Sequence, residues 1–118
     1  MLFLCYPKCS TCRKARAFLD EAGIAYTFRD IQKDNPTAAE LDAWQTQSGL
    51  PLKRFFNTSG QAYRRLTLKD RLPAMPRTEQ LALLATDGLL VKRPLLVANA
   101  FVLVGFSLPQ WQAALQTG

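Results

Sequence analysis

Residues 2–12 read Leu-Phe-Leu-Cys-Tyr-Pro-Lys-Cys-Ser-Thr-Cys, an apolar run followed by two cysteines that are separated by two residues. The apolar run favours a buried strand, and the pattern from Ser10 to Ala22 favours a helix. A strand that ends in a Cys-x-x-Cys turn brings the first sulfur to a helix N-terminus. Unpaired backbone N–H groups and the helix dipole favour thiolate over thiol there. We therefore predict that Cys9 is an acidic and partly exposed nucleophile.

The other cysteines have different surroundings. Cys12 precedes Ala15 by three residues, which places it on the apolar face that Phe18 and Leu19 continue. We expect Cys12 to be shielded and to act as a resolving thiol that displaces a product from Cys9. Cys5 lies within the apolar run, where a free cysteine usually behaves as a small buried hydrophobe. We therefore predict that Cys5 belongs to the core.

Two alternatives for the cysteine pair remain open but are less favoured. A zinc site needs four ligands, and the chain has three cysteines and no histidine. A purely structural disulfide between Cys9 and Cys12 would close a very short loop and would restrict the unfolded chain little. The sequence therefore predicts no metal site and favours a redox role for the pair.

The composition limits the functional classes. The 118 residues fit one domain over residues 1–118, and 48% of them are hydrophobic. The net charge is +6, but the basic residues are dispersed and no aromatic RNA-binding signature accompanies them, so we expect no direct nucleic-acid binding. No apolar run reaches 18 residues and no secretory signal pattern opens the chain. We expect a cytoplasmic protein without a membrane span, and paired cysteines in that compartment are more often catalytic or redox-sensing.

The rest of the chain predicts the fold. Residues 25–30 alternate like a strand, so the chain opens with a strand–helix–strand unit whose strands are parallel. A hairpin is predicted from residues 95–97 and 101–104, and a last helix follows from Ser107. Between these halves lies a helical insertion at about residues 35–88, with helices to about Ser48, at 66–72 and at 78–85. The prediction is an α/β, thioredoxin-like fold of the glutaredoxin type, with a mixed four-stranded sheet.

Three motifs together resemble a known family. Residues 6–19, 92–94 and 104–106 are similar to the corresponding motifs of the glutaredoxin-coupled arsenate reductases (ArsC) and the related Spx-type transcription regulators. The resemblance covers essentially the whole chain and points to the Cys-x-x-Cys branch of arsenate-reductase-like proteins. It implies no metal or organic cofactor, and a reductant such as glutathione, glutaredoxin or thioredoxin.

The resemblance also implies roles for individual residues. Cys9 matches the nucleophile, and Arg13 matches the arginine after the active loop, which we assign to substrate binding. Arg93 matches an arginine beside the thiol that binds an oxyanion or stabilises the thiolate. Pro94 matches a proline that the fold holds in the cis form next to the active cysteine, where it shapes the substrate edge.

The chain departs from the family's pattern at three places, and two functions remain as candidates. Cys12 stands where these arsenate reductases usually have serine, a middle-loop arginine is replaced near Asn57, and residues 104–106 hold no arginine. The sequence predicts a thiol–disulfide oxidoreductase that acts on a protein disulfide or an oxyanion. The alternative is an Spx-like redox-sensing regulator that binds the RNA polymerase α subunit, with Gly49 as the contact.

Overall fold

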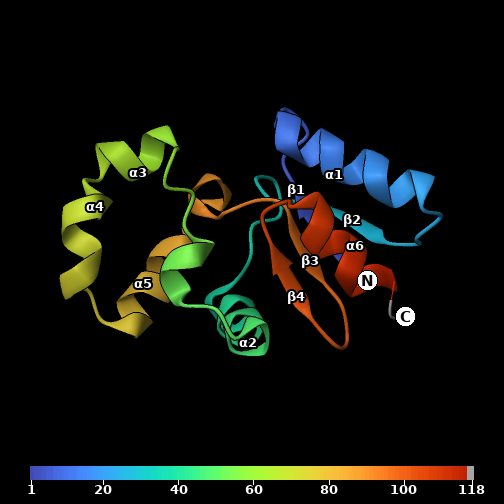
Figure 1. Ribbon diagram of the computed structural model, residues 1–118. Helices are drawn as coiled ribbons and strands as arrows, with labels where there is room; N and C mark the ends of the chain where they lie inside the picture. Colours follow the sequence, from blue (N-terminus) through green and yellow to red (C-terminus); the bar gives the residue numbers. More distant parts are fainter. Residues whose placement is uncertain (117–118) are drawn as a thin grey trace.

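The computed structural model describes residues 1–116, which form a four-stranded sheet flanked by helices (Figure 1). The strand order is β2-β1-β3-β4. The strands are β1 (Leu2–Cys5), β2 (Thr27–Asp30), β3 (Leu95–Val97) and β4 (Val102–Val104). The mixed sheet confirms the predicted thioredoxin-like fold class.

The strand pairing follows from the connections between the strands. α1 (Ser10–Glu21) links β1 to β2, and these two strands pair in parallel, with Phe3 opposite Phe28. β3 and β4 form an antiparallel hairpin, and β3 also pairs antiparallel with β1. Both the parallel unit and the hairpin are therefore where the sequence predicted them.

The segment between β2 and β3 is mainly helical from residue 38 to residue 90. Its elements are α2 (Ala38–Ser48), η1 (Leu52–Phe55), α3 (Gln61–Arg65), α4 (Leu68–Arg71), η2 (Leu72–Ala74), α5 (Arg77–Leu84) and η3 (Gly88–Leu90). α3 was not predicted, and the helix predicted over residues 66–72 is wrong in extent because Thr67 adopts a positive φ of 52° before α4 begins. No helix within residues 1–116 is long and apolar enough to cross a membrane.

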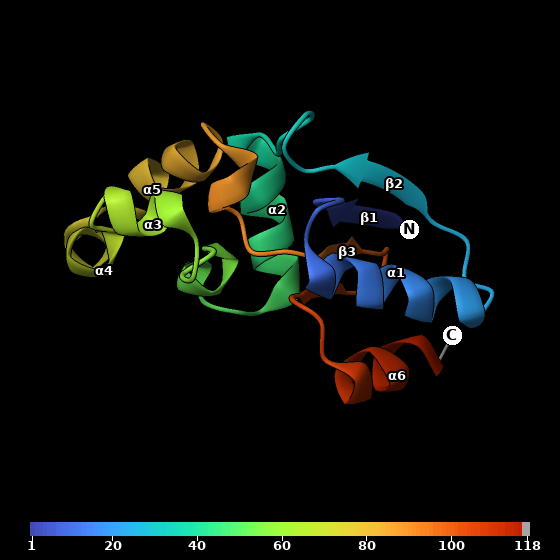
Figure 2. The ribbon, with the colours of Figure 1, turned by 90° about the horizontal axis from the view of Figure 1, so that it is seen from above.

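Alternate residues of β1 serve two separate cores, because successive side chains of a strand point to opposite faces. Phe3 and Cys5 belong to a cluster with α1 and α6 (Leu108–Gln116), which includes the fully buried Trp111. Leu4 belongs to the other cluster, with α2 and the helices of the insertion. Figure 2 shows α1 and α6 on one side of the sheet and α2 on the other.

An ion pair fastens the insertion to the sheet. Arg29 of β2 donates hydrogen bonds of 2.7 and 3.0 Å to the two carboxylate oxygens of Glu40. Glu40 also completes a capping box with Thr37 at the start of α2, which satisfies backbone N–H groups there. The hydrogen bonds from Arg29 are the main reason why the pKa of Glu40 falls to about 2. The first turn of α2 is thereby tied to the edge of the sheet.

Candidate active site

Cys9 is the residue that precedes the first turn of α1. Its backbone is extended, with φ −86° and ψ 125°, and its carbonyl oxygen accepts the first helical hydrogen bond from the Arg13 N–H at 3.1 Å. The turn that leads out of β1 is closed by a bond of 2.9 Å from the Cys9 N–H to the Tyr6 carbonyl. The side chain is half-buried, and it is the free cysteine of the described structure. The local sequence therefore places the sulfur at a helix N-terminus, as predicted.

The surroundings of Cys9 make its thiol more acidic. Burial by itself raises the pKa of Cys9, but the backbone N–H groups of Cys12 and Thr11 lower it, and so do hydrogen bonding and charge from Arg93. The net effect is a pKa below the ordinary value of 9.0. These groups favour the charged form of the sulfur. A larger share of Cys9 is thus in the nucleophilic state at neutral pH.

Arg93 reaches the site from the segment before β3. Its guanidinium donates a hydrogen bond of 3.3 Å to the Leu89 carbonyl and lies 5.2 Å from the centre of the Tyr6 ring. Its Nε is buried and has no hydrogen-bond partner among the described residues. The Arg93–Pro94 peptide bond is cis, as the family resemblance implied. Arg93 therefore lies beside Cys9, and its Nε–H group remains without a hydrogen-bond acceptor among the described residues.

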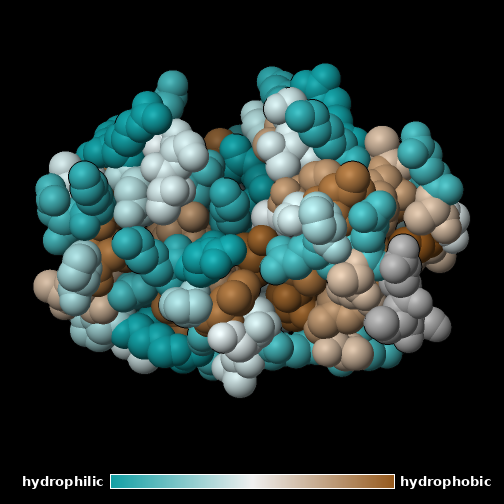
Figure 3. Space-filling view, in the orientation of Figure 1, coloured by the Kyte–Doolittle hydropathy of each residue, from teal (hydrophilic) through white to brown (hydrophobic). Residues whose placement is uncertain are grey.

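A cavity of about 460 Å³ opens at Cys9. It is lined by Cys9, Thr11, Arg54, Asn57, Ser59, Lys92, Arg93, Val104, Gly105, Phe106, Ser107 and Gln110. Arg54 and Lys92 were not predicted as site residues, although Lys92 directly precedes Arg93 and Arg54 lies in a basic stretch. Figure 3 shows that the surface between the start of α1 and the helical insertion is recessed and largely hydrophilic. Within residues 1–116, three cationic side chains and no carboxylate line this cavity, so it suits an anionic group.

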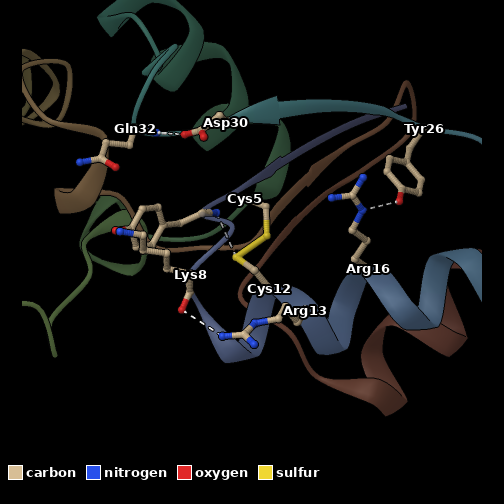
Figure 4. The surroundings of a disulfide bond; sticks show 9 residues. Cys5, Lys8, Cys12, Arg13, Arg16, Tyr26, Asp30 and Gln32 are labelled. Carbon is tan, nitrogen blue, oxygen red and sulfur yellow. Dashed lines mark hydrogen bonds between the residues drawn. A yellow bond between two sulfur atoms is a disulfide. The ribbon is translucent and has the colours of Figure 1, made fainter.

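The structure pairs Cys12 with a different cysteine from the one predicted. Cys12 and Cys5 are 1% and 2% exposed, so both are buried as expected. Their sulfur atoms are joined as a disulfide, with the two Cα atoms 5.7 Å apart, and Figure 4 shows this bond between the end of β1 and the first turn of α1. The Tyr6 backbone N–H donates a hydrogen bond of 3.3 Å to the Cys12 sulfur. The predicted Cys9–Cys12 disulfide is therefore not the one present, because Cys5 points from the sheet toward the same turn.

Two other predicted residues lie away from the cavity. Arg13 is exposed, and its guanidinium donates to the Lys8 carbonyl at 3.5 Å, as Figure 4 shows. Gly49 lies at the end of α2, where its φ of 69° favours glycine. Their assigned roles in substrate binding and polymerase contact stay predictions. No group of three or more potential metal-ligating side chains occurs among the described residues.

This chain is similar to several known proteins. The model of the ArsC family matches residues 4–114. YusI of Bacillus subtilis, described as uncharacterized, is 48% identical, and the match covers 95% of each chain. A Bacteroides fragilis structure described as a putative ArsC family related protein has a TM-score of 0.92 at 58% identity, covering 95% of this chain and 94% of the other.

Two further relatives bear on function. A Streptococcus mutans structure described as a possible arsenate reductase has a TM-score of 0.85 at 46% identity, covering 94% of this chain and 96% of that one. The global transcriptional regulator Spx of Staphylococcus aureus is 26% identical over 86% of this chain and 76% of its own length. The similar proteins thus include both an enzyme description and a regulator.

Proposed function

This chain belongs to the ArsC family, and we propose that it is a thiol–disulfide oxidoreductase with Cys9 as the nucleophile. The observation that carries the proposal is the half-buried Cys9 sulfur, which has a lowered pKa and opens into a cavity with three cationic side chains. Family membership and the similarity to a protein described as a possible arsenate reductase support a thiol-dependent reductase in general.

The reaction starts from the protein with all three thiols reduced. The Cys9 thiolate attacks one sulfur of a substrate disulfide R–S–S–R′, so that a Cys9–S–S–R bond forms and R′S⁻ leaves. The Cys12 thiolate then attacks the Cys9 sulfur, forms a Cys9–Cys12 disulfide and expels RS⁻. One substrate disulfide is reduced by two electrons while two cysteines are oxidised. The Tyr6 N–H, 3.3 Å from the Cys12 sulfur, stabilises the attacking thiolate.

The cavity favours a substrate that carries negative charge. Arg54, Lys92 and Arg93 line it, and cationic side chains strengthen the binding of carboxylates and oxyanions. A mixed disulfide with a carboxylated thiol such as glutathione suits both the nucleophile and this lining. Arsenate suits it less, since Asn57 stands near the place of one arginine and residues 104–106 supply none. We propose glutathione, glutaredoxin or thioredoxin as the reductant, a reaction that needs no bound metal or organic group, and a cytoplasmic location.

The test follows Cys9 directly. Reduced wild type, Cys9→Ser and Cys12→Ser are each incubated with oxidised glutathione and analysed by intact mass. We expect no adduct on Cys9→Ser and one stable glutathione adduct on Cys12→Ser, because removal of the resolving thiol traps the mixed disulfide. Turnover of a glutathione-mixed disulfide and of arsenate is measured with the same proteins. If Cys9→Ser retains wild-type reductase activity, the proposal is wrong.

The similarity to Spx favours one second candidate, a redox-sensing regulator that binds the RNA polymerase α subunit. In that function a disulfide is a switch and not a turnover intermediate, and Gly49 at the end of α2 is the proposed contact. Binding of the reduced and the oxidised protein to the purified C-terminal domain of the polymerase α chain separates the two functions. Tight, redox-dependent binding without reductase turnover favours the regulator.

A further inference from the structure

The cysteine that the proposed reaction leaves unused is Cys5. Its sulfur is joined to that of Cys12, while Cys9 is free. A reaction that ends at a Cys9–Cys12 disulfide does not produce this arrangement. We propose that Cys5 is a third redox-active cysteine, which takes over the disulfide from Cys9 and so regenerates the Cys9 thiolate. This inference rests on the proposed function of Cys9.

Burial shows why the pair cannot easily be oxidised from outside. Cys5 and Cys12 are 2% and 1% exposed, and both belong to the apolar cluster under α1. A substrate as large as a peptide or glutathione disulfide cannot place its sulfur against either of them. Cys9 lines the cavity and is half-buried, so oxidising equivalents enter at Cys9.

The geometry places Cys12 between the two other cysteines. Cys9 directly precedes the first turn of α1, which contains Cys12, and the Cys12 backbone N–H stabilises the Cys9 thiolate. On the other side, the Cys5 and Cys12 Cα atoms are 5.7 Å apart, within the usual range of about 4.4–6.8 Å for a disulfide. The Cys12 sulfur can therefore exchange partners between the half-buried Cys9 and the buried Cys5.

The exchange step balances in atoms and electrons. The Cys5 sulfur attacks the Cys12 sulfur of the Cys9–Cys12 disulfide, a Cys5–Cys12 bond forms, and the Cys9–Cys12 bond breaks with Cys9 leaving as thiolate. The Cys5 thiol gives up its proton to solvent and attacks as a thiolate, so the negative charge passes to Cys9, which leaves as thiolate. The substrate disulfide supplied the oxidising equivalents in the preceding step, so no further oxidant is needed.

The direction of exchange follows from the leaving group. A thiol with a lower pKa leaves faster in thiol–disulfide exchange. Backbone N–H groups and Arg93 stabilise the Cys9 thiolate, so Cys9 is a good leaving group when Cys5 attacks the Cys12 sulfur. The final state stores the disulfide in the interior and keeps a reactive thiolate in the cavity. Reduction of the buried pair then proceeds by reversal through Cys9.

The chain offers a simple way to locate the bond. Trypsin cleaves after Lys8 and after Arg13, so Cys5 falls in peptide 1–8 while both Cys9 and Cys12 fall in peptide 9–13. A Cys5–Cys12 disulfide links the two peptides, whereas a Cys9–Cys12 disulfide stays within peptide 9–13. Fragmentation of an iodoacetamide-labelled peptide 9–13 then identifies which of its cysteines is free.

The experiment uses the reduced full-length protein and one equivalent of oxidised glutathione, with samples acid-quenched over time and labelled before digestion. We expect wild type to pass from an internal Cys9–Cys12 disulfide to linked peptides 1–8 and 9–13 that carry the label on Cys9. Cys5→Ala stops at the internal disulfide. Cys9→Ser forms the Cys5–Cys12 bond at least about tenfold more slowly, because the entry thiol is gone.

The outcomes separate this inference from the proposed function. If oxidised wild type ends at Cys9–Cys12 with Cys5 labelled, the transfer to Cys5 is refuted while the nucleophilic role of Cys9 stands. If Cys9→Ser forms Cys5–Cys12 as fast as wild type, the buried pair is oxidised directly and the transfer is also refuted. If Cys12→Ser forms no glutathione adduct on Cys9, both proposals fail. The wild-type mapping needs no variant and stays decisive if Cys5→Ala does not fold.

Discussion

Glu40→Gln tests the ion pair that fastens the helical insertion to the sheet. The pKa of Glu40 falls from 4.5 to about 2, chiefly through its hydrogen bonds from Arg29. At about 1.4 kcal/mol per pKa unit, this shift corresponds to an upper limit of about 3.5 kcal/mol in the free energy of unfolding. The Glu40 side chain is 34% exposed, so solvent screening reduces the expected loss to about 1.5–2 kcal/mol at neutral pH.

The depressed pKa of Glu40 also determines how its contribution to stability changes with pH. The folded-state pKa of Glu40 is depressed, so its contribution is fully present above the unfolded value of 4.5 and is lost as the pH falls through about 2. Urea unfolding of wild type and Glu40→Gln at about pH 7, 5 and 3 measures the difference. We expect it to be unchanged between pH 7 and 5 and to fall by roughly half at pH 3, since the unfolded state is then largely protonated at this carboxyl.

The matched control is Glu21→Gln, which removes an exposed carboxylate that forms no ion pair among residues 1–116. Its free energy of unfolding should stay within about 0.5 kcal/mol of wild type at every pH. All samples contain a strong reductant, so that the disulfide state is the same. A difference for Glu40→Gln that is as large at pH 3 as at pH 7 refutes the electrostatic reasoning.

Three further predictions concern the site and its supports. Arg93→Gln raises the pH midpoint of iodoacetamide alkylation of Cys9, because the charge that lowers the pKa of Cys9 is lost. Arg13→Gln leaves the midpoint in place, since Arg13 donates to the Lys8 carbonyl instead. An unmoved midpoint in Arg93→Gln contradicts the prediction. Gly88→Ala lowers the free energy of unfolding in urea by more than about 2 kcal/mol, since the added Cβ would overlap the backbone carbonyl oxygen of Ile31, directly after β2. A decrease of less than about 1 kcal/mol contradicts this prediction. Trp111→Phe removes the 3.0 Å hydrogen bond from the indole N–H to the buried Gly105 carbonyl. The free energy of unfolding should fall by about 1–3 kcal/mol, which lowers the urea midpoint. A midpoint equal to that of wild type contradicts this prediction.

The fold was largely predictable because its main signals are local. The apolar run of β1, the helical period of α1 and the hairpin of β3 and β4 each lie within a short stretch of chain. The insertion was predicted less well. α3 and α4 are short, and a left-handed Thr67 separates them, a conformation that neither composition nor periodicity indicates.

The site was predictable in part for the same reason. The position of Cys9 at the start of α1 depends on the turn after β1, which the sequence shows directly. Its partners in the cavity come from separate segments. Arg54 lies within η1 and Lys92 lies before β3, and only the packing of the insertion against the sheet brings them to the same opening. Basic residues that are scattered along the sequence do not show which of them lie together in the folded protein.

The sequence by itself determined which sulfur would stand at the N-terminus of α1, because a helix start and its unpaired N–H groups are properties of a few consecutive residues. Only the tertiary structure decided that the second sulfur pairs with Cys5. That choice depends on the direction in which β1 presents its side chains and on how closely α1 packs over the sheet. The spacing of the cysteines in the sequence indicates neither the side-chain directions of β1 nor the distance between α1 and the sheet.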